Sequence, residues 1–329
     1  MKRILALVLA LLLLTGCGAA QSATPTTTAT AEATEPQPTA EASNAGVLAG
    51  KKIIFIGNSY TQAANVVIDY GYSKLTQQER IYDQGYFYQL CKANGVDSVN
   101  VTAWCFGGHN ITDTFAEACT KADKPCTGEN HPGYLEDPYY DYVVIQPYSE
   151  PKYQGDLLAH LQPTMDFFKE ANPDVKFLVL VPHMAVEKEY AWAKQLKDLE
   201  GSGIIICNWG AMLHDIVKGN VEVPGAQQPY GRPTFVISVS QEDGHHQNIL
   251  AGYLTALMVY CAITGDTAVG QTYDFCADPK VNSKFVDFET YKSKRYTYEP
   301  YTNFDLVFQS EADMAGLQQL VDQYIAKFN

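Results

Sequence analysis

Short apolar segments alternate with longer helical patterns along most of this chain. Apolar runs typical of strands lie at residues 52–56, 97–104, 142–146, 175–182 and 203–207, and a weaker candidate lies at 234–239. Helical patterns lie between them at residues 84–94, 156–171 and 187–199, and residues 249–264 are apolar nearly all round. Apolar strands that alternate with helices are typical of βαβ units, in which helices cover both faces of a parallel sheet.

Small or polar residues follow four of the predicted strands. Parallel sheets of this kind bind ligands at the carboxyl ends of their strands. The residues expected at this edge are Ser59, the pair Gly107 and Gly108, Gln146 and His183. We therefore expect the chemistry of the protein to lie there.

The first residues have the pattern of an export signal. Lys2 and Arg3 precede an apolar run at residues 4–14, which is too short to cross a bilayer about 30 Å thick. Cys17 follows directly after Leu-Thr-Gly, and "LTGC" resembles the bacterial lipobox, in which the cysteine is lipidated. The alternative is a plain secretory signal with a chance cysteine. We expect residues 1–16 to be a lipoprotein signal peptide and Cys17 to carry the lipid.

Residues 17–48 are polar and rich in Ala, Thr, Pro and Glu. They have almost nothing to bury, so we expect a disordered linker between the anchor and a globular domain at residues 49–329. About thirty extended residues reach on the order of 90 Å. The expected location is the extracellular face of the cell membrane, with membrane contact only through the lipid on Cys17.

Charge and cysteine content narrow the possible partners. The chain has 23 Lys and Arg against 37 Asp and Glu, and this net charge of −14 argues against nucleic acid, which needs a basic face. No C-x-x-C pair occurs, so a cysteine zinc site is not expected.

Export permits disulfides, and Cys119 and Cys126 are the candidate pair. Cys207 and Cys261 lie in apolar runs and are expected to be small buried hydrophobes.

The first informative motif is "FIGNSYT" at residues 55–61, where an apolar strand stops at Gly57, Asn58 and Ser59. These three residue types suit a tight turn, which is the structural interpretation. The chemical interpretation is that the turn presents Ser59 as a nucleophile, and this requires a base, an orienting acid and an oxyanion site elsewhere.

The second motif is "SQEDGHHQN" at residues 240–248. Asp243 and His246 are three residues apart, so the carboxylate can bond Nδ1–H of the imidazole and leave Nε2 to face a serine. Taken alone, the motif favours another interpretation, in which Asp243 caps the next helix and the histidines lie on the surface. A metal held by Asp243, His245 and His246 is a further alternative.

Two further motifs offer oxyanion donors. In "WCFGGHN", at residues 104–110, a glycine lets the backbone turn an N–H toward a substrate oxygen. In "VVIQPYSE", at residues 143–150, the amide of Gln146 can donate in the same way. A tight turn and an ordinary strand-end residue are the alternatives.

Together and in this order, the motifs resemble those of the SGNH hydrolases, also called GDSL-type esterases, over roughly residues 50–265. "GNSYT" is similar to the first block and aligns Ser59 with the nucleophile. Gly108, in preference to Gly107, matches the oxyanion glycine of the second block, and "DGHH" fits the last block with Asp243 and His246. The resemblance implies an α/β fold that is three-layer and doubly wound (flavodoxin-like), with a mostly parallel five-stranded sheet.

Two positions depart from the family pattern. Asn58 replaces the Asp that usually precedes the serine, but that residue is not a triad member. The third block, Gly-x-Asn-Asp in the family, reads "IQPYSE" here. Its Asn is an oxyanion donor, and Gln146 is the nearest chemical equivalent. Losing such a donor costs about 3 kcal/mol in barrier, which slows catalysis without abolishing it.

The resemblance implies a serine esterase that forms an acyl-enzyme, with no metal and no organic cofactor. The expected substrate is a small-molecule or polysaccharide ester, in particular an O-acyl or O-acetyl group on carbohydrate. Tyrosines near the third block could line a sugar-stacking cleft, although most are expected to be ordinary surface and core residues. They are Tyr139, Tyr140, Tyr142 and Tyr148.

Two other interpretations stay open. A surface lipoprotein that binds a ligand or carbohydrate without turnover would have the same signal, lipobox and linker. A degenerate hydrolase would keep the pocket and lose the activity. A pure binding protein needs no Ser59, Asp243 and His246 triad, so this triad is what separates the interpretations.

Overall fold

The computed structural model describes one compact unit, Ser43–Asn329, in part. The described residues are 43–62, 66–67, 85–105, 135, 137–147, 157–182, 196–197, 199–231, 235, 247–276 and 310–329. The predicted signal peptide, the lipidation site Cys17 and the candidate pair Cys119 and Cys126 lie outside these residues.

The compact unit begins earlier than the predicted boundary at residue 49. A short 3-10 helix, η1 (Asn44–Leu48), buries Ala45 and Leu48 against the main core. Asp266 accepts hydrogen bonds from Ser43 Oγ (2.6 Å) and from the backbone nitrogen of Asn44 (2.7 Å). Composition alone assigned these residues to the linker, because the segment carries only three apolar side chains, Ala45, Val47 and Leu48.

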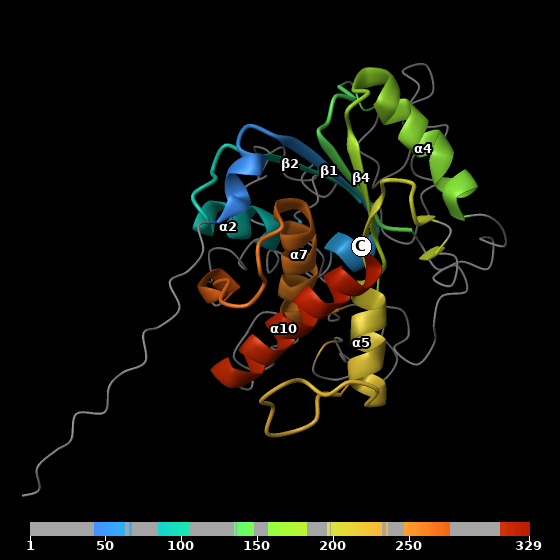
Figure 1. Cartoon of the computed structure of the whole chain (residues 1–329). Helices are drawn as coiled ribbons and strands as arrows, with labels where there is room; N and C mark the ends of the chain where they lie inside the picture. The colour runs from blue at the N-terminus through green and yellow to red at the C-terminus, as the bar shows by residue number, and fades with distance from the viewer. Residues whose placement is uncertain are drawn as a thin grey trace, which may run out of the picture. The chain divides into compact units, whose positions relative to one another are not determined.

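Five parallel strands form one sheet in the order β2-β1-β3-β4-β5 (Figure 1). Every pairing between neighbouring strands is parallel. This is the strand order of the flavodoxin-like doubly wound fold, so the predicted fold class is confirmed. The strands are β1 (Lys52–Gly57), β2 (Asn100–Cys105), β3 (Tyr142–Ile145), β4 (Lys176–Leu180) and β5 (Ile205–Cys207).

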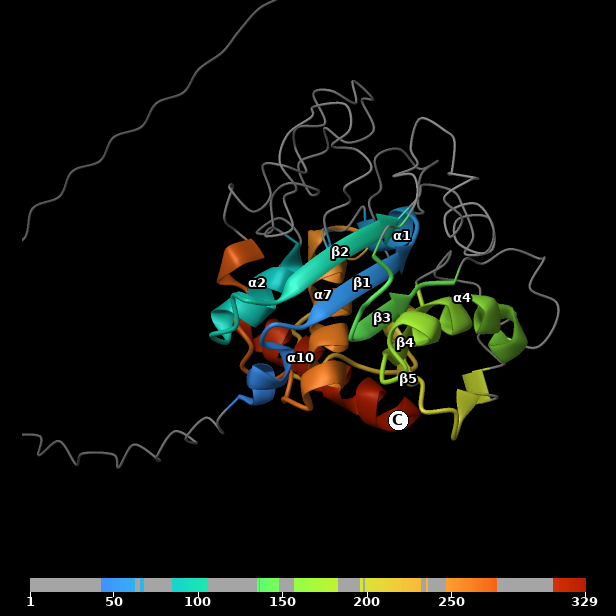
Figure 2. The same cartoon turned by 90° about the horizontal axis from the view of Figure 1, so that it is seen from above.

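The two faces of the sheet are covered by different helices. Along β1, Ile53 and Phe55 pack into one core cluster, and Ile54 and Ile56 pack into the other, because successive strand side chains point to opposite faces. Figure 2 shows α2, α7 and α10 on one side of the sheet and α4 on the other. The helices are α1 (Ser59–Gln62), α2 (Tyr86–Ala93), α4 (Leu157–Ala171), α5 (Trp209–Lys218), α7 (Ile249–Thr264) and α10 (Glu311–Phe328), with a 3-10 turn η5 (Asp274–Cys276).

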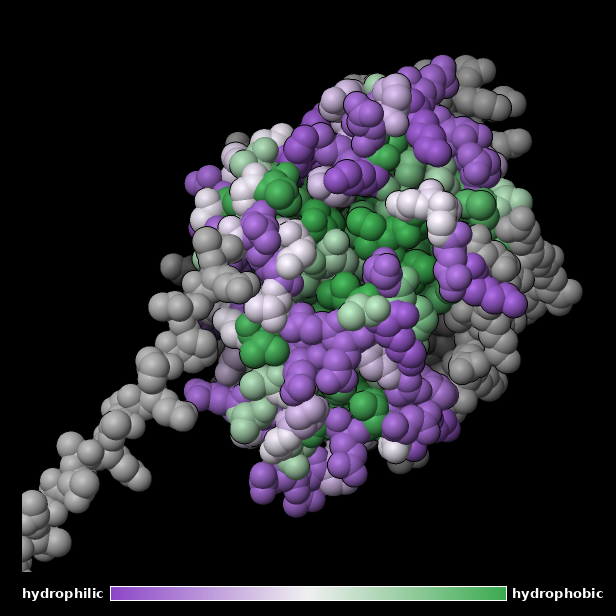
Figure 3. Space-filling view, viewed as in Figure 1, coloured by the Kyte–Doolittle hydropathy of each residue, from purple (hydrophilic) through white to green (hydrophobic). Residues whose placement is uncertain are grey.

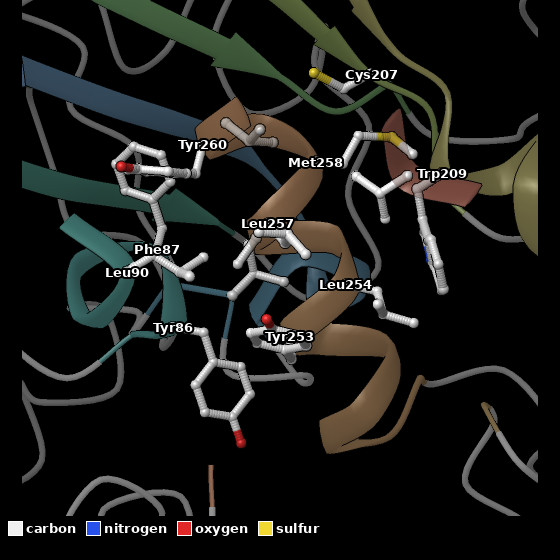
Figure 4. Packing of buried hydrophobic residues seen from close by; sticks show 14 of the residues in the cluster. Tyr86, Phe87, Leu90, Cys207, Trp209, Tyr253, Leu254, Leu257, Met258 and Tyr260 are labelled. Carbon is white, nitrogen blue, oxygen red and sulfur yellow. The ribbon is translucent and has the colours of Figure 1, made fainter. Parts of the chain in front are cut away.

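Helix α7 is the centre of the larger core. It occupies the predicted range, and nearly all of its residues are buried, as expected from an apolar pattern with no polar face. Figure 4 shows side chains of α7 beside Phe87 and Leu90 of α2 and Trp209 of α5. The outer faces of α4 and α10 carry mainly hydrophilic residues (Figure 3). None of the described helices is both long and apolar enough to cross a membrane.

Candidate active site

The predicted nucleophile turn lies at the carboxyl end of β1. Asn58 is fully buried, and Ser59 is the first residue of α1. Asn58 Oδ1 accepts a hydrogen bond from the backbone nitrogen of Tyr60 (3.0 Å), and the Asn58 carbonyl accepts one from that of Thr61 (3.1 Å). Asn58 therefore caps the start of α1, a position that Asn and Asp suit equally well.

Gln146 ties the end of β3 to this turn. Its Oε1 accepts hydrogen bonds from the backbone nitrogen of Asn58 (3.2 Å) and from Thr61 Oγ1 (2.9 Å). Its Nε2 donates to the carbonyl of Pro147 (3.0 Å), and its backbone nitrogen donates to the carbonyl of Ile56 (2.8 Å). The side chain is only 1% exposed. The turn is therefore held by the side chain of Gln146.

The contact between Gln146 Oε1 and the turn requires a glycine at position 57. A Cβ atom at this position would lie 2.8 Å from Gln146 Oε1 and 3.1 Å from Thr61 Oγ1. Real Cβ atoms essentially never approach an oxygen to 2.8 Å, so either the amide or the strand end would have to move. The glycine that ends β1 thus allows β1 and the Gln146 side chain to approach each other.

The turn lies at the topological switch point of the sheet. Gly57 is in register with Cys105 at the end of β2, and Ile56 is in register with Ile145 at the end of β3. From β1 the chain continues to β2 on one side and later to β3 on the other, so the strand order reverses at β1. Doubly wound folds bind their ligands at this reversal. Gly108 follows the end of β2 by three residues in the sequence and lies outside the described residues.

A second buried glutamine connects this turn to the last motif. Gln247 Nε2 donates to the carbonyl of Tyr60 (2.8 Å), and its Oε1 accepts from Trp209 Nε1 (2.9 Å). Tyr60 directly follows Ser59, and Gln247 directly follows His246, although the two bonded residues are 187 positions apart. The fold therefore brings the residues adjacent to Ser59 and His246 together. Gln247 was not among the predicted site residues, and its position beside His246 is the one signal for it in the sequence.

The start of α7 tests one alternative for the last motif. Asn248 is the N-cap of this helix, and its Oδ1 accepts from the backbone nitrogen of Ala251 (3.1 Å). The interpretation in which Asp243 caps this helix is therefore wrong. Asp243, His245 and His246 lie outside the described residues, so their contacts stay predictions.

Three tyrosines proposed to line a sugar cleft lie at the wrong edge of the sheet. Tyr142 is the first residue of β3, whereas Gln146 follows its last, so Tyr142 is at the amino edge. Tyr140 is also buried, and its ring packs on Phe168 with centroids 5.8 Å apart. Tyr139 is 47% exposed but precedes the same amino end. The cleft interpretation is wrong for these three, and Tyr148 lies outside the described residues.

Two strands of the sheet end in a cysteine. Cys105 ends β2 and Cys207 ends β5, and both are buried. Burial raises the pKa of the Cys207 thiol to about 12, so it is protonated at neutral pH. Across the described ranges, no group of three or more His, Cys, Asp or Glu side chains could hold a metal ion.

The chain matches no known protein-family profile and no curated protein. Among solved structures it is similar to a candidate SGNH hydrolase from Slackia heliotrinireducens, with 15% identity, a TM-score of 0.38, and coverage of 65% of this chain and 98% of that chain. A family 2 carbohydrate esterase with a carbohydrate-binding domain, from Corynascus thermopiles (Myceliophthora fergusii), is 14% identical, with a TM-score of 0.37 and coverage of 70% and 68%. A family 2 carbohydrate esterase from Clostridium thermocellum, solved with cellohexaose, is also 14% identical, with a TM-score of 0.37 and coverage of 65% and 64%. Similarity at this level does not transfer an activity to this chain.

Proposed function

We propose that this protein is a serine esterase of the SGNH type. Ser59 is the nucleophile, His246 the general base and then acid, and Asp243 the residue that orients His246. The observation that carries the proposal is the hydrogen bond from Gln247 Nε2 to the carbonyl of Tyr60 (2.8 Å). This bond supports the triad because it joins the immediate neighbours of Ser59 and His246.

The proposed reaction has two steps. Ser59 Oγ attacks the ester carbonyl carbon while Nε2 of His246 takes the hydroxyl proton, and that proton then goes to the departing alkoxide. The product of this step is an acyl-enzyme and a free alcohol. A water molecule, deprotonated by His246, attacks the acyl carbon, and Ser59 is released with its proton as the carboxylic acid leaves.

Three donors form the proposed oxyanion site: the N–H groups of Ser59 and Gly108 and the side chain of Gln146. The orientation of the Gln146 amide follows from its partners, since the backbone N–H of Asn58 can only donate and therefore faces Oε1. Nε2 carries two hydrogens, and one is donated to the carbonyl of Pro147. The second hydrogen is the proposed oxyanion donor.

The proposed substrate is an O-acyl or O-acetyl group on carbohydrate. The support is the export signal and the lipidation of Cys17, both predicted from the sequence, and the polar linker expected at residues 17–48. A domain anchored through a linker of this length would reach polysaccharides outside the membrane. The proposed location is therefore the extracellular face of the cell membrane.

Hydrolysis of p-nitrophenyl acetate and release of acetate from acetylated xylan test the proposal. We expect turnover by the unmodified chain and its loss in Ser59→Ala and His246→Ala. Release from the nitrophenyl ester alone would retain the esterase and remove carbohydrate as its substrate. Binding of acetylated xylan without any turnover would instead support a non-catalytic or degenerate protein.

A further inference from the structure

We propose that Gln247 is a positioning residue of this hydrolase, whose side-chain amide fixes the Ser59 turn relative to the segment that carries His246. This inference rests on the proposed function, because it assigns Gln247 a role in bringing two triad members together. Gln247 itself is not expected to touch the substrate.

The orientation of the Gln247 amide is fixed from both ends. A peptide carbonyl can only accept a hydrogen bond, so Nε2 must face Tyr60, and an indole N–H can only donate, so Oε1 must face Trp209. A flipped amide would place a donor against a donor and an acceptor against an acceptor. With 1% of Gln247 exposed, water cannot readily replace either partner.

The partners of Gln247 belong to three different helices. Tyr60 lies on α1 beyond the end of β1, and Trp209 begins α5 beyond the end of β5. Thr255 on α7 lies with Oγ1 3.4 Å from Gln247 Oε1 and also donates to the carbonyl of Ala251 (2.7 Å). One amide therefore links the segments that follow β1 and the edge strand β5 with helix α7, which follows the His246 segment.

Trp209, one of the hydrogen-bond partners of Gln247, is held in place by its packing. Its side chain is fully buried, and its ring packs against Phe235 with centroids 6.2 Å apart. Since the carbonyl of Phe235 also accepts from the backbone nitrogen of Asn248 (2.8 Å), the residue after Gln247 is held to the same group. Movement of the Gln247 amide would require breaking contacts on both sides of it.

The catalytic consequence follows from the distances that proton transfer needs. A serine and its base work within about 0.5 Å of the productive geometry, and a displacement of about 1 Å can cost roughly 100-fold in rate. Ser59 and His246 come from segments far apart in the chain, so their spacing depends on tertiary contacts. The bond between their neighbours is such a contact, and its loss should lower kcat more than it raises KM.

The test compares two buried glutamines. Gln247→Met keeps an unbranched side chain of similar size and removes both hydrogen bonds. Gln318→Met is the matched control, because Gln318 on α10 is also buried, with Nε2 donating to Tyr253 Oη (2.9 Å) and Oε1 accepting from the backbone nitrogen of Gly270 (3.0 Å). Both variants should lose stability, since each leaves buried polar partners without a bond.

Three readouts on the full chain separate positioning from stability: Tm, kcat and KM for p-nitrophenyl acetate, and the rate of fluorophosphonate labelling. We expect Gln247→Met to lower kcat and the labelling rate by roughly 10- to 100-fold with KM within about twofold. Gln318→Met should lower Tm similarly and leave both rates unchanged. Trp209→Phe removes the indole donor together with part of a buried ring, and it should lower kcat several-fold. With Tm measured alongside, this variant keeps the test decisive if Gln247→Met does not fold.

Each outcome bears on the inference. Wild-type rates in folded Gln247→Met, or in Trp209→Phe if the former does not fold, would overturn the positioning role and leave the esterase intact. An equal loss of kcat in Gln318→Met would overturn it too, because the effect would then be general. Absence of turnover and labelling in the unmodified chain would remove the proposed function and this inference with it.

Discussion

The side-chain oxygen of Gln146 lies 3.2 Å from the backbone nitrogen of Asn58 and thereby joins the end of β3 to the turn that begins with Gly57. The same oxygen accepts from Thr61 Oγ1. Gln146 thus has a structural role toward the turn. Its proposed role toward the oxyanion uses the opposite end of the amide.

These two roles of Gln146 can be separated by mutation. Gln146→Ala removes both ends of the amide, so we expect kcat to fall roughly 100-fold or more, the usual cost of losing an oxyanion donor. Thr61→Val removes one contact of the turn and leaves Nε2 in place, so kcat should fall much less. Undiminished turnover in Gln146→Ala would exclude the donor role, and equal losses in both variants would assign the whole effect to the turn.

The close approach at Gly57 makes a prediction about stability. Gly57→Ala should destabilise the protein by about 1–3 kcal/mol, because its Cβ would overlap Gln146 Oε1. It should also slow the labelling of Ser59. Gly46→Ala is the control, since a Cβ there meets nothing within 4 Å, and the change should be neutral or stabilising by up to ~1 kcal/mol. Urea unfolding of both variants makes the comparison, and equal stabilities would contradict the predicted overlap.

Three buried cysteines should be inert in the folded protein. Cys91, Cys207 and Cys261 are buried, and burial raises the pKa of each thiol, to about 12 for Cys91 and Cys207. Iodoacetamide should leave them unmodified at neutral pH and should alkylate them in denaturant, as peptide mapping can show. Rapid alkylation of any of the three without denaturant would contradict the packing around α7.

Asp266 should contribute to stability above acid pH. Burial alone would raise the pKa of its carboxyl, but hydrogen bonds from Ser43, Asn44 and Tyr260 outweigh burial and lower it. A lowered folded-state pKa means that the contribution is present above the unfolded value of about 3.9 and is lost as the pH falls through the folded value. We expect Tm to drop below about pH 4, and the drop should be smaller in Asp266→Asn. Identical acid profiles would show that this carboxyl is not linked to folding.

The sequence predicted those parts of the fold that burial alone determines. β1 and α7 were located because their apolar residues are continuous, and the α/β class followed from the alternation of such segments. The position of Gln146 at the sheet edge also followed from the pattern, since it ends an apolar run. Its bonds to Asn58 and Thr61 could not be predicted, because they depend on the register of β3 against β1.

Two positions show how distance along the chain differs from distance in space. Tyr142 is close to Gln146 in sequence, but Tyr142 begins the four-residue strand β3 and Gln146 follows its end, so the two lie at opposite edges of the sheet. Gln247 was overlooked because a polar residue beside a histidine gives no sign of burial, and its partners Tyr60 and Trp209 come from distant segments. Tyr142 and Gln146 are close in sequence but far apart in the sheet. Gln247 and its partners are far apart in sequence but in contact, and the sequence alone does not reveal such a contact.

The most direct test of the central claim is the intact mass of the protein after incubation with a fluorophosphonate probe. If Ser59 is an activated nucleophile, the unmodified chain should be labelled stoichiometrically. Labelling should be lost in Ser59→Ala, which lacks the nucleophile, and in His246→Ala, which lacks the base. Folded, unmodified protein that takes up no probe would contradict the account and would favour a binding or degenerate protein.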